Sequence, residues 1–170
     1  MPSESARASS TAESRYRIDA PNARPRAVKV VALDRPSQAV VERLGQERWN
    51  GAGFLTASVF SAAAQADGGF SMQAWLSDLS GRTRHLLDEI AGVDQVVMIA
   101  SAGEDVPAAA IIGEACSLKR VTTTALVIGS AAASDQALAR TLAQLRPWAL
   151  MLVVASSEEY IADMLRALHA

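Results

Sequence analysis

The chain has 170 residues, of which half are hydrophobic and a fifth are charged, and its formal net charge is −2. This length suits one domain with a core of its own. The slightly negative charge excludes a general attraction to nucleic acid or to anionic membranes. The single cysteine, Cys116, excludes an internal disulfide and a multi-cysteine zinc site, so no metal site is expected.

Residues 1–26 differ in composition from the rest of the chain. They are rich in Ser, Ala, Arg and Pro, and their apolar residues are sparse and without period, which predicts a mobile N-terminal tail. We expect a single α/β domain over residues 27–170. No apolar run approaches the roughly 20 residues of a membrane span, and no secretory pattern opens the chain, so a cytoplasmic location is expected.

From residue 27 onward, apolar runs alternate with segments of helical periodicity. The valine-rich run 27–33 is typical of a strand buried on both faces, and a helix is expected at 35–49. Pro36 suits the first turn of that helix, where its missing N–H is not needed. Further strands are predicted at 53–60, 94–100, 121–129 and 148–155. Further helices are predicted at 79–93, 106–119, 134–146 and 156–170, and residues 61–74 remain ambiguous.

Strands that alternate with helices predict a parallel sheet covered on both faces. Right-handed crossovers leave few ways to connect such a sheet. The expected fold is therefore α/β, with a three-layer, doubly wound and mostly parallel five-stranded sheet of Rossmann-like or flavodoxin-like type.

A ligand of such a sheet binds outside the carboxyl ends of the strands. The loops that follow the predicted strands carry small, hydroxyl or charged side chains, and most run directly into a helix whose N–H groups face the loop. The candidate ligand-binding residues are Asp34, Arg35, Ser37, Ser101, Gly103, Glu104, Asp105, Ser130 and Ser156.

The segment VVMIASAGEDVPAAAIIGEAC, residues 96–116, has the strand–loop–helix form of a phosphate site. Its loop has one glycine, Gly103, and no lysine, and the chain has neither a Walker A nor a G-x-G-x-x-G motif. Glu104 and Asp105 precede the helix, where carboxylates stabilise the helix dipole themselves. Three interpretations are open: these acids cap the helix, they face a cation or a positively charged ligand, or they act in acid–base chemistry.

The order of elements from Val28 onward resembles the nucleotide-binding half of the tubulin and FtsZ family. The closest part is RTRHLLDEIAGVDQVVMIASAGEDVPAAAIIGEA, which is similar to a helix, a strand opening with aspartate, the phosphate loop and the alanine-proline helix of that family. The resemblance implies a Rossmann-like fold with a degenerate glycine loop. The chain departs from the family in its first loop, where Asp34, Arg35 and Pro36 replace a glycine cluster.

These features favour a non-catalytic α/β module that binds a partner protein or itself, as a homo-oligomer, with room for a small ligand at the strand ends. One alternative is a nucleotide- or cofactor-binding protein with a divergent phosphate loop. Another is a small hydrolase or transferase that uses Asp34, Ser101, Glu104 or Asp105. Cys116 is expected to be a small buried hydrophobe. The cofactor and the catalytic residues are unassigned, and neither nucleic acid nor a membrane is an expected partner.

Overall fold

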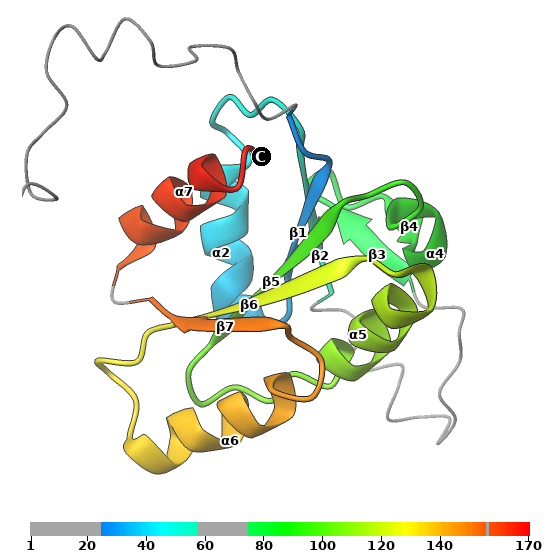
Figure 1. The fold of residues 1–170 in the computed structure, drawn as a ribbon. Helices are drawn as coiled ribbons and strands as arrows, with labels where there is room; N and C mark the ends of the chain where they lie inside the picture. Colours follow the sequence, from blue (N-terminus) through cyan, green and yellow to red (C-terminus); the bar gives the residue numbers. More distant parts are fainter. Residues whose placement is uncertain (1–24, 58–74, 156) are drawn as a thin grey trace, which may run out of the picture.

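The structure, a computed structural model, describes residues 25–57, 75–155 and 157–170 and holds one seven-stranded sheet (Figure 1). Its strand order is β4-β3-β2-β1-β5-β6-β7. The strands are β1 (Val28–Ala32), β2 (Ala52–Thr56), β3 (Trp75–Asp78), β4 (Thr83–His85), β5 (Gln95–Ser101), β6 (Thr122–Ile128) and β7 (Met151–Val154).

The sheet is mostly parallel. The strands β2, β1, β5, β6 and β7 run in one direction, whereas β3 pairs antiparallel with both β2 and β4. In the register at the centre of the sheet, Val30 lies between Phe54 of β2 and Val97 of β5. Parallel neighbours require crossover connections, and helices supply them here.

Five helices accompany the sheet in the part of the chain that the structure describes. They are α2 (Arg35–Leu44), α4 (Leu86–Glu89), α5 (Ala108–Lys119), α6 (Asp135–Leu145) and α7 (Glu158–Ala167). None of the helices in this described part is long and apolar enough to cross a membrane.

The core consists of two hydrophobic clusters, because successive side chains of a strand point to opposite faces of the sheet. On β5, Val97 and Ile99 join the cluster that α2 and α7 cover, whereas Val96 and Met98 join the cluster that α4, α5 and α6 cover. Figure 1 shows α2 and α7 on one side of the sheet and α5 and α6 on the other. Burial on both faces explains why β1, β5 and β6 are continuous apolar runs.

Five strand predictions coincide with β1, β2, β5, β6 and β7, but the expected total of five strands is wrong because β3 and β4 extend the sheet. The expected helix over 79–93 is also wrong: β4 and the short α4 occupy that segment. The reason is the turn between β3 and β4. The Asp78 carboxylate accepts hydrogen bonds of 2.9 Å from the backbone N–H groups of Ser80 and Arg82, and Gly81 adopts a left-handed φ of 76°. This turn chemistry favours a hairpin over a helix.

The helix α2 is shorter than expected, because it ends at Leu44 and not at residue 49. Trp49 instead folds back, and its indole N–H donates to the carbonyl oxygen of Leu44 at 2.7 Å. This bond uses one of the carbonyl groups that a helix end leaves without an intrahelical partner. The predicted tail and the ambiguous segment 61–74 lie outside the described residues, except for the last two tail residues.

Candidate functional site

The strand order reverses at the carboxyl ends of β1 and β5. The chain leaves β1 into α2 on one face of the sheet, and it leaves β5 toward α5 on the other face. A crevice for ligands opens at such a point in parallel sheets. Asp34 directly precedes α2 and Ser101 is the last residue of β5, so two predicted site residues lie at this point.

The Asp34 carboxylate lies between the ends of β1 and β5 and is hydrogen-bonded to residues on both sides. Its Oδ2 accepts the backbone N–H of Ser101 at 2.7 Å, and its Oδ1 accepts the Ser101 hydroxyl at 2.9 Å. The same Oδ1 accepts the backbone N–H of Ser37 at 2.7 Å. Only 6% of Asp34 is exposed, so these bonds replace the hydration that its burial removes.

The bonds with Ser37 form a reciprocal cap at the start of α2. While Asp34 accepts from the Ser37 N–H, the Ser37 hydroxyl oxygen accepts the Asp34 N–H at 3.2 Å and donates to the Asp34 carbonyl at 3.0 Å. A carboxylate at a helix N-terminus satisfies free N–H groups and complements the positive end of the helix dipole. The Asp34 carboxylate therefore occupies the place that a phosphate or another anion would take at this helix.

The loop after β5 also directs its N–H groups to acceptors within the protein. Ala102 donates to the Ile128 carbonyl at 2.8 Å, Gly103 donates to the Thr141 hydroxyl at 3.0 Å, and Val106 donates to the Gln144 side-chain oxygen at 2.8 Å. The N–H of Glu104 donates to the Ser101 carbonyl at 3.1 Å. A phosphate cradle needs such groups free to face the ligand, and here these four are engaged.

Gly103 is the residue at which this loop turns. Its φ of 94° lies in the left-handed region, which glycine adopts without steric cost. The turn directs the loop onto α6, where Thr141 is fully buried and its hydroxyl also donates to the Glu104 carbonyl at 3.0 Å. Gly103, which the sequence suggested as a ligand-binding residue, therefore allows the loop to turn toward α6.

Glu104 and Asp105 do not cap α5, so that interpretation is wrong. The helix begins at Ala108, and its N-cap residue is Pro107, which makes no side-chain cap. The Asp105 carboxylate accepts instead from the Gln144 side-chain amide of α6 at 3.0 Å. Val106 and Pro107 separate the two acids from the first turn of α5. Both acids are exposed.

The other candidate residues lie apart from this hydrogen-bonded group. Arg35 is exposed on the first turn of α2, and Ser130 is half-buried in the turn after β6. Ser156 lies outside the described residues. The structure thus brings Asp34, Ser37 and Ser101 together by hydrogen bonds, and joins Gly103, Glu104 and Asp105 to α6.

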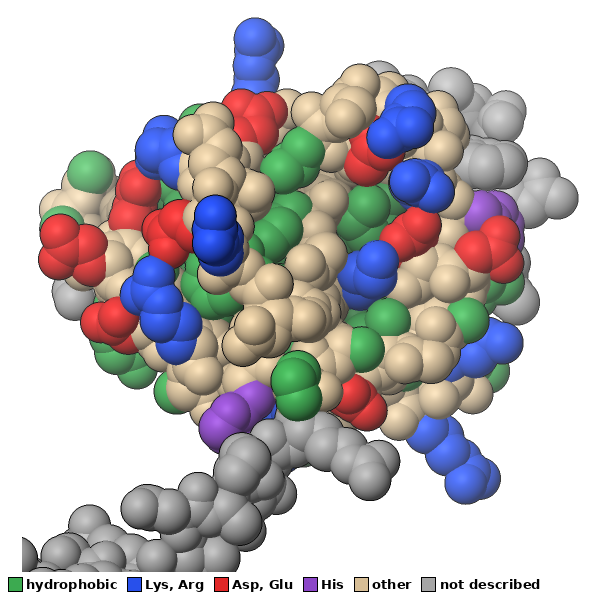
Figure 2. All heavy atoms as spheres, turned by 90° about the horizontal axis from the view of Figure 1, so that it is seen from above, with side chains coloured by type: hydrophobic (Ala, Val, Ile, Leu, Met, Phe, Trp, Pro, Cys, Tyr) green, Lys and Arg blue, Asp and Glu red, His purple; other side chains and the backbone are tan. Residues whose placement is uncertain are grey.

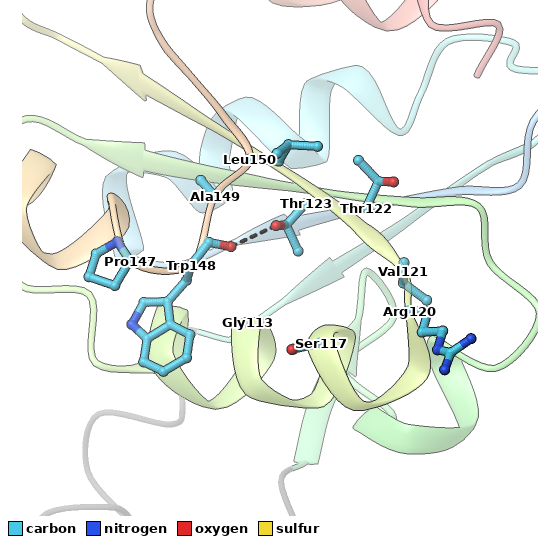
Figure 3. A pocket seen from close by; sticks show the side chains of 10 residues that line it. All are labelled: Gly113, Ser117, Arg120, Val121, Thr122, Thr123, Pro147, Trp148, Ala149 and Leu150. Carbon is cyan, nitrogen blue, oxygen red and sulfur yellow. Dashed lines mark hydrogen bonds between the residues drawn. The ribbon is translucent and has the colours of Figure 1, made fainter.

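Sequence reasoning missed a groove of about 500 Å³ at the amino ends of β6 and β7 (Figure 3). The end of α5, the start of β6 and the connection from α6 to β7 form it. Its lining residues are Gly113, Ser117, Arg120, Val121, Thr122, Thr123, Pro147, Trp148, Ala149 and Leu150. This set has one cation and no histidine, cysteine or carboxylate, so it offers no general base for acid–base catalysis.

A glycine in mid-helix is the signal that could have indicated this groove. A Cβ atom on Gly113 would lie 2.5 Å from the Cβ of Trp148 and 2.9 Å from its ring, so the tryptophan contacts the helix backbone. Trp148 is held in turn by the Thr123 hydroxyl, which donates to its carbonyl at 2.6 Å. Glycine disfavours helix relative to alanine, which is why its presence in α5 indicates a close approach.

The titratable groups give no further catalytic arrangement in the described part of the chain. Cys116 is fully buried in α5, and burial raises the pKa of its thiol to about 12, so it stays protonated. The described ranges contain no cluster of three His, Cys, Asp or Glu side chains that could hold a metal ion. On the face that Figure 2 shows, Lys and Arg side chains are interspersed with Asp and Glu side chains.

No protein-family model matches the chain, and no curated protein matches it either.

Proposed function

We propose that this chain is a non-catalytic α/β module that binds a partner protein or a second copy of itself. The fold proposed for it is doubly wound and flavodoxin-like. The order of its five parallel strands, β2-β1-β5-β6-β7, supports this assignment, since it corresponds to the order 2-1-3-4-5 of that class with an antiparallel hairpin added at one edge. The cytoplasmic location expected from the sequence is part of the same proposal.

The observation that carries the proposal is the internal use of the Asp34 carboxylate. At the point where this fold class binds anionic cofactors, Asp34 accepts hydrogen bonds from Ser37 and from Ser101. A bound phosphate would have to displace a buried carboxylate that three donors satisfy. Displacement would leave the charge of Asp34 without its partners, which is costly in a buried site.

The arrangement also argues against hydrolase or transferase chemistry at this point. The Ser101 hydroxyl donates to Asp34 at 2.9 Å, and both side chains are buried. A nucleophilic serine needs access to substrate and a base that is itself oriented by a third group. Neither acid of the neighbouring loop contributes to the pair: Glu104 is exposed, and the exposed Asp105 directs its carboxylate to Gln144 of α6.

Nucleotide or cofactor binding is the second candidate, and the strand order favours it because the crevice of this fold class lies at β1 and β5. The resemblance to the tubulin and FtsZ family remains a proposal of the same kind. It is supported by the succession of elements, and the carboxylate in place of the first glycine cluster counts against a bound nucleotide.

Thermal unfolding with nucleotides, flavins and acyl-CoA separates these two candidates. If the chain is the proposed module, none of them should raise its melting temperature. A ligand present at 100 times its dissociation constant would stabilise the fold by about 2.7 kcal/mol, and a shift of that size would establish the second candidate. Sedimentation over a range of concentrations, with affinity capture from a cell extract, tests the proposed binding activity. A strict monomer that captures nothing contradicts it.

A further inference from the structure

The two edges of the sheet differ in chemistry. The edge strand β4 carries Arg84, whose guanidinium lies 3.5 Å from the Asp78 carboxylate and 3.9 Å from that of Glu89. A charged side chain is one means by which proteins prevent an edge from pairing. The opposite edge strand, β7, has the sequence MLVV and carries no charge, proline or glycine. Within the described residues, β4 is therefore the edge strand with a charged side chain and β7 the one without.

The β7 edge is also exposed. Leu150, directly before β7, is 83% exposed, and Met151 and Val154 are 39% and 42% exposed. In the described part of the chain β7 pairs only with β6, so its outer side presents unpaired backbone N–H and carbonyl groups. Figure 1 shows β7 as the last strand of the sheet, with α6 on one side of it and α7 on the other.

We propose that β7 pairs antiparallel with β7 of a second copy of this chain, about a two-fold axis at Leu152, and joins two sheets into one. The inference rests on the proposed function and names a partner for it, the chain itself. A two-fold pairing is closed, so it produces a dimer rather than a filament.

The two faces of the sheet limit the possible registers. Leu152 and Val154 lie beside Ala125 and Val127 of β6 and share the face of the α5 and α6 cluster. Residues that face each other across an antiparallel pair point to the same side of the sheet. In a two-fold dimer, one residue of β7 must therefore lie opposite the same residue of the second copy, with the symmetry axis between them. With the axis at Leu152, the highly exposed Leu150 faces Val154 of the second copy, and Met151 faces its Val153.

Charge complementarity selects the antiparallel arrangement. Exposed basic residues lie at the amino ends of β6 and β7, and exposed acidic residues lie at their carboxyl ends. The basic residues are Lys119, Arg120 and Arg146, and the acidic residues are Asp135, Glu158 and Glu159. Antiparallel pairing brings the basic end of each copy to the acidic end of the other, whereas a parallel pairing would bring like charges together. Since Glu158 already pairs with Arg43 at 2.7 Å, Glu159 is the acid to test.

Sedimentation equilibrium of the full chain, from about 5 μM to about 500 μM, covers the range of weak self-association. We expect a reversible monomer–dimer equilibrium. Replacing Leu150→Ser should raise the dissociation constant by about tenfold or more, because it removes a largely exposed apolar side chain that the pairing buries. Leu118→Ser, at a leucine that is 63% exposed on α5, is the matched control and should leave the constant unchanged. Thermal melting checks that both variants are folded.

Charge reversal tests the direction of pairing. Arg146→Glu and Glu159→Arg should each weaken association, because each places like charges at both ends of the dimer. Mixing the two variants should restore it, since acidic then meets basic at both ends of the mixed dimer. Arg48→Glu, an exposed arginine in the connection between α2 and β2, is the control for the change in charge.

Two results would overturn the inference. One is a monomer throughout the concentration range, in which case capture of another protein would still support the proposed function. The other is a dimer that neither Leu150→Ser nor the charge reversals change, which would place self-association elsewhere on the molecule. Hydrogen exchange gives a direct readout, since amides of residues 151–154 should exchange more slowly as the dimer forms.

Discussion

The Asp34 carboxylate accepts the backbone N–H of Ser101 at 2.7 Å, across 67 residues of sequence, and so joins the end of β1 to the end of β5. The same carboxylate caps α2 through Ser37. One side chain thereby connects β1, β5 and α2 at the carboxyl ends of two parallel strands. Its role here is to hold these elements together.

Replacing Asp34→Ala should destabilise the fold by about 2–4 kcal/mol, because it removes a helix cap and leaves the buried Ser101 N–H without an acceptor. Urea unfolding measures the loss. Ser134→Ala is the matched control: Ser134 caps α6 through the Ala137 N–H at 3.2 Å without bridging two strands, so about 1 kcal/mol should be lost. Equal losses would show that the bond to Ser101 contributes nothing.

Gln144 should anchor the loop after β5. Its side chain accepts from Val106 and donates to Asp105, so Gln144→Ala should cost about 1–2 kcal/mol and leave the Val106 N–H without its partner. Hydrogen exchange of residues 102–106 should accelerate. Gln136→Ala, at an exposed glutamine of the same helix, should change neither quantity. Unchanged exchange in the Gln144 variant would contradict this anchoring role.

Gly113→Ala should destabilise the protein although alanine is the better helix former. The added methyl would lie 2.5 Å from the Cβ of Trp148, and relieving that overlap should cost about 1–3 kcal/mol, against a gain in helix propensity of roughly 1 kcal/mol. Thermal melting and tryptophan fluorescence monitor the change. Ser117→Ala, in the same groove, should be close to neutral, whereas a stabilised Gly113 variant would show that Trp148 moves freely.

The Cys116 thiol should resist modification in the folded chain. It is fully buried, and burial raises its pKa to about 12, so very little thiolate forms at pH 8. An aromatic disulfide reagent should react slowly with the native protein and rapidly after unfolding in urea. Rapid reaction of the native protein would indicate that α5 separates readily from the sheet.

Asp78 should contribute a pH-dependent part of the stability. The hydrogen bond from the Arg82 N–H is the largest cause that lowers the pKa of this carboxyl below its ordinary 3.8, and the Ser80 N–H and the guanidinium groups of Arg82 and Arg84 add to it. A lowered folded pKa means that the contribution is present above pH 3.8 and is lost as the pH falls through the folded value. Asp78→Asn should therefore be less stable than the wild type at pH 7 and equal to it in strong acid. A difference in stability that persists at pH 2 would indicate that the substitution perturbs the turn itself, and not only the charge of Asp78.

The central strands were predictable because burial on both faces demands a continuous apolar run. The residues of β5 are all buried, and the runs of β1 and β6 are nearly so, which leaves a signal in the sequence itself. Pro36 likewise marked the first turn of α2, since proline is compatible with that position for local steric reasons.

The hairpin of β3 and β4 was not predictable in the same way. Leu86 and Ile90 are buried at a helical spacing, so the segment has the pattern of an amphipathic helix. What turns it into a strand and a short helix is the bonding of Asp78 to the turn and the pairing of β3 with β2. Pairing between strands is a tertiary contact, and local periodicity does not record it.

The sequence by itself determined the class of fold, the parallel core strands and the presence of Asp34, Ser101 and Gly103 at the strand ends, because these depend on local burial and on the chemistry of short segments. Only the tertiary structure decided what those residues do. The Asp34 carboxylate points inward because Ser101, from a distant strand, donates to it. The Asp105 carboxylate does not cap α5 and instead accepts a hydrogen bond from Gln144 of α6. Hydrogen bonds between elements far apart in the chain form only when the sheet brings those elements together. The role of each residue at the strand ends therefore depends on the tertiary structure.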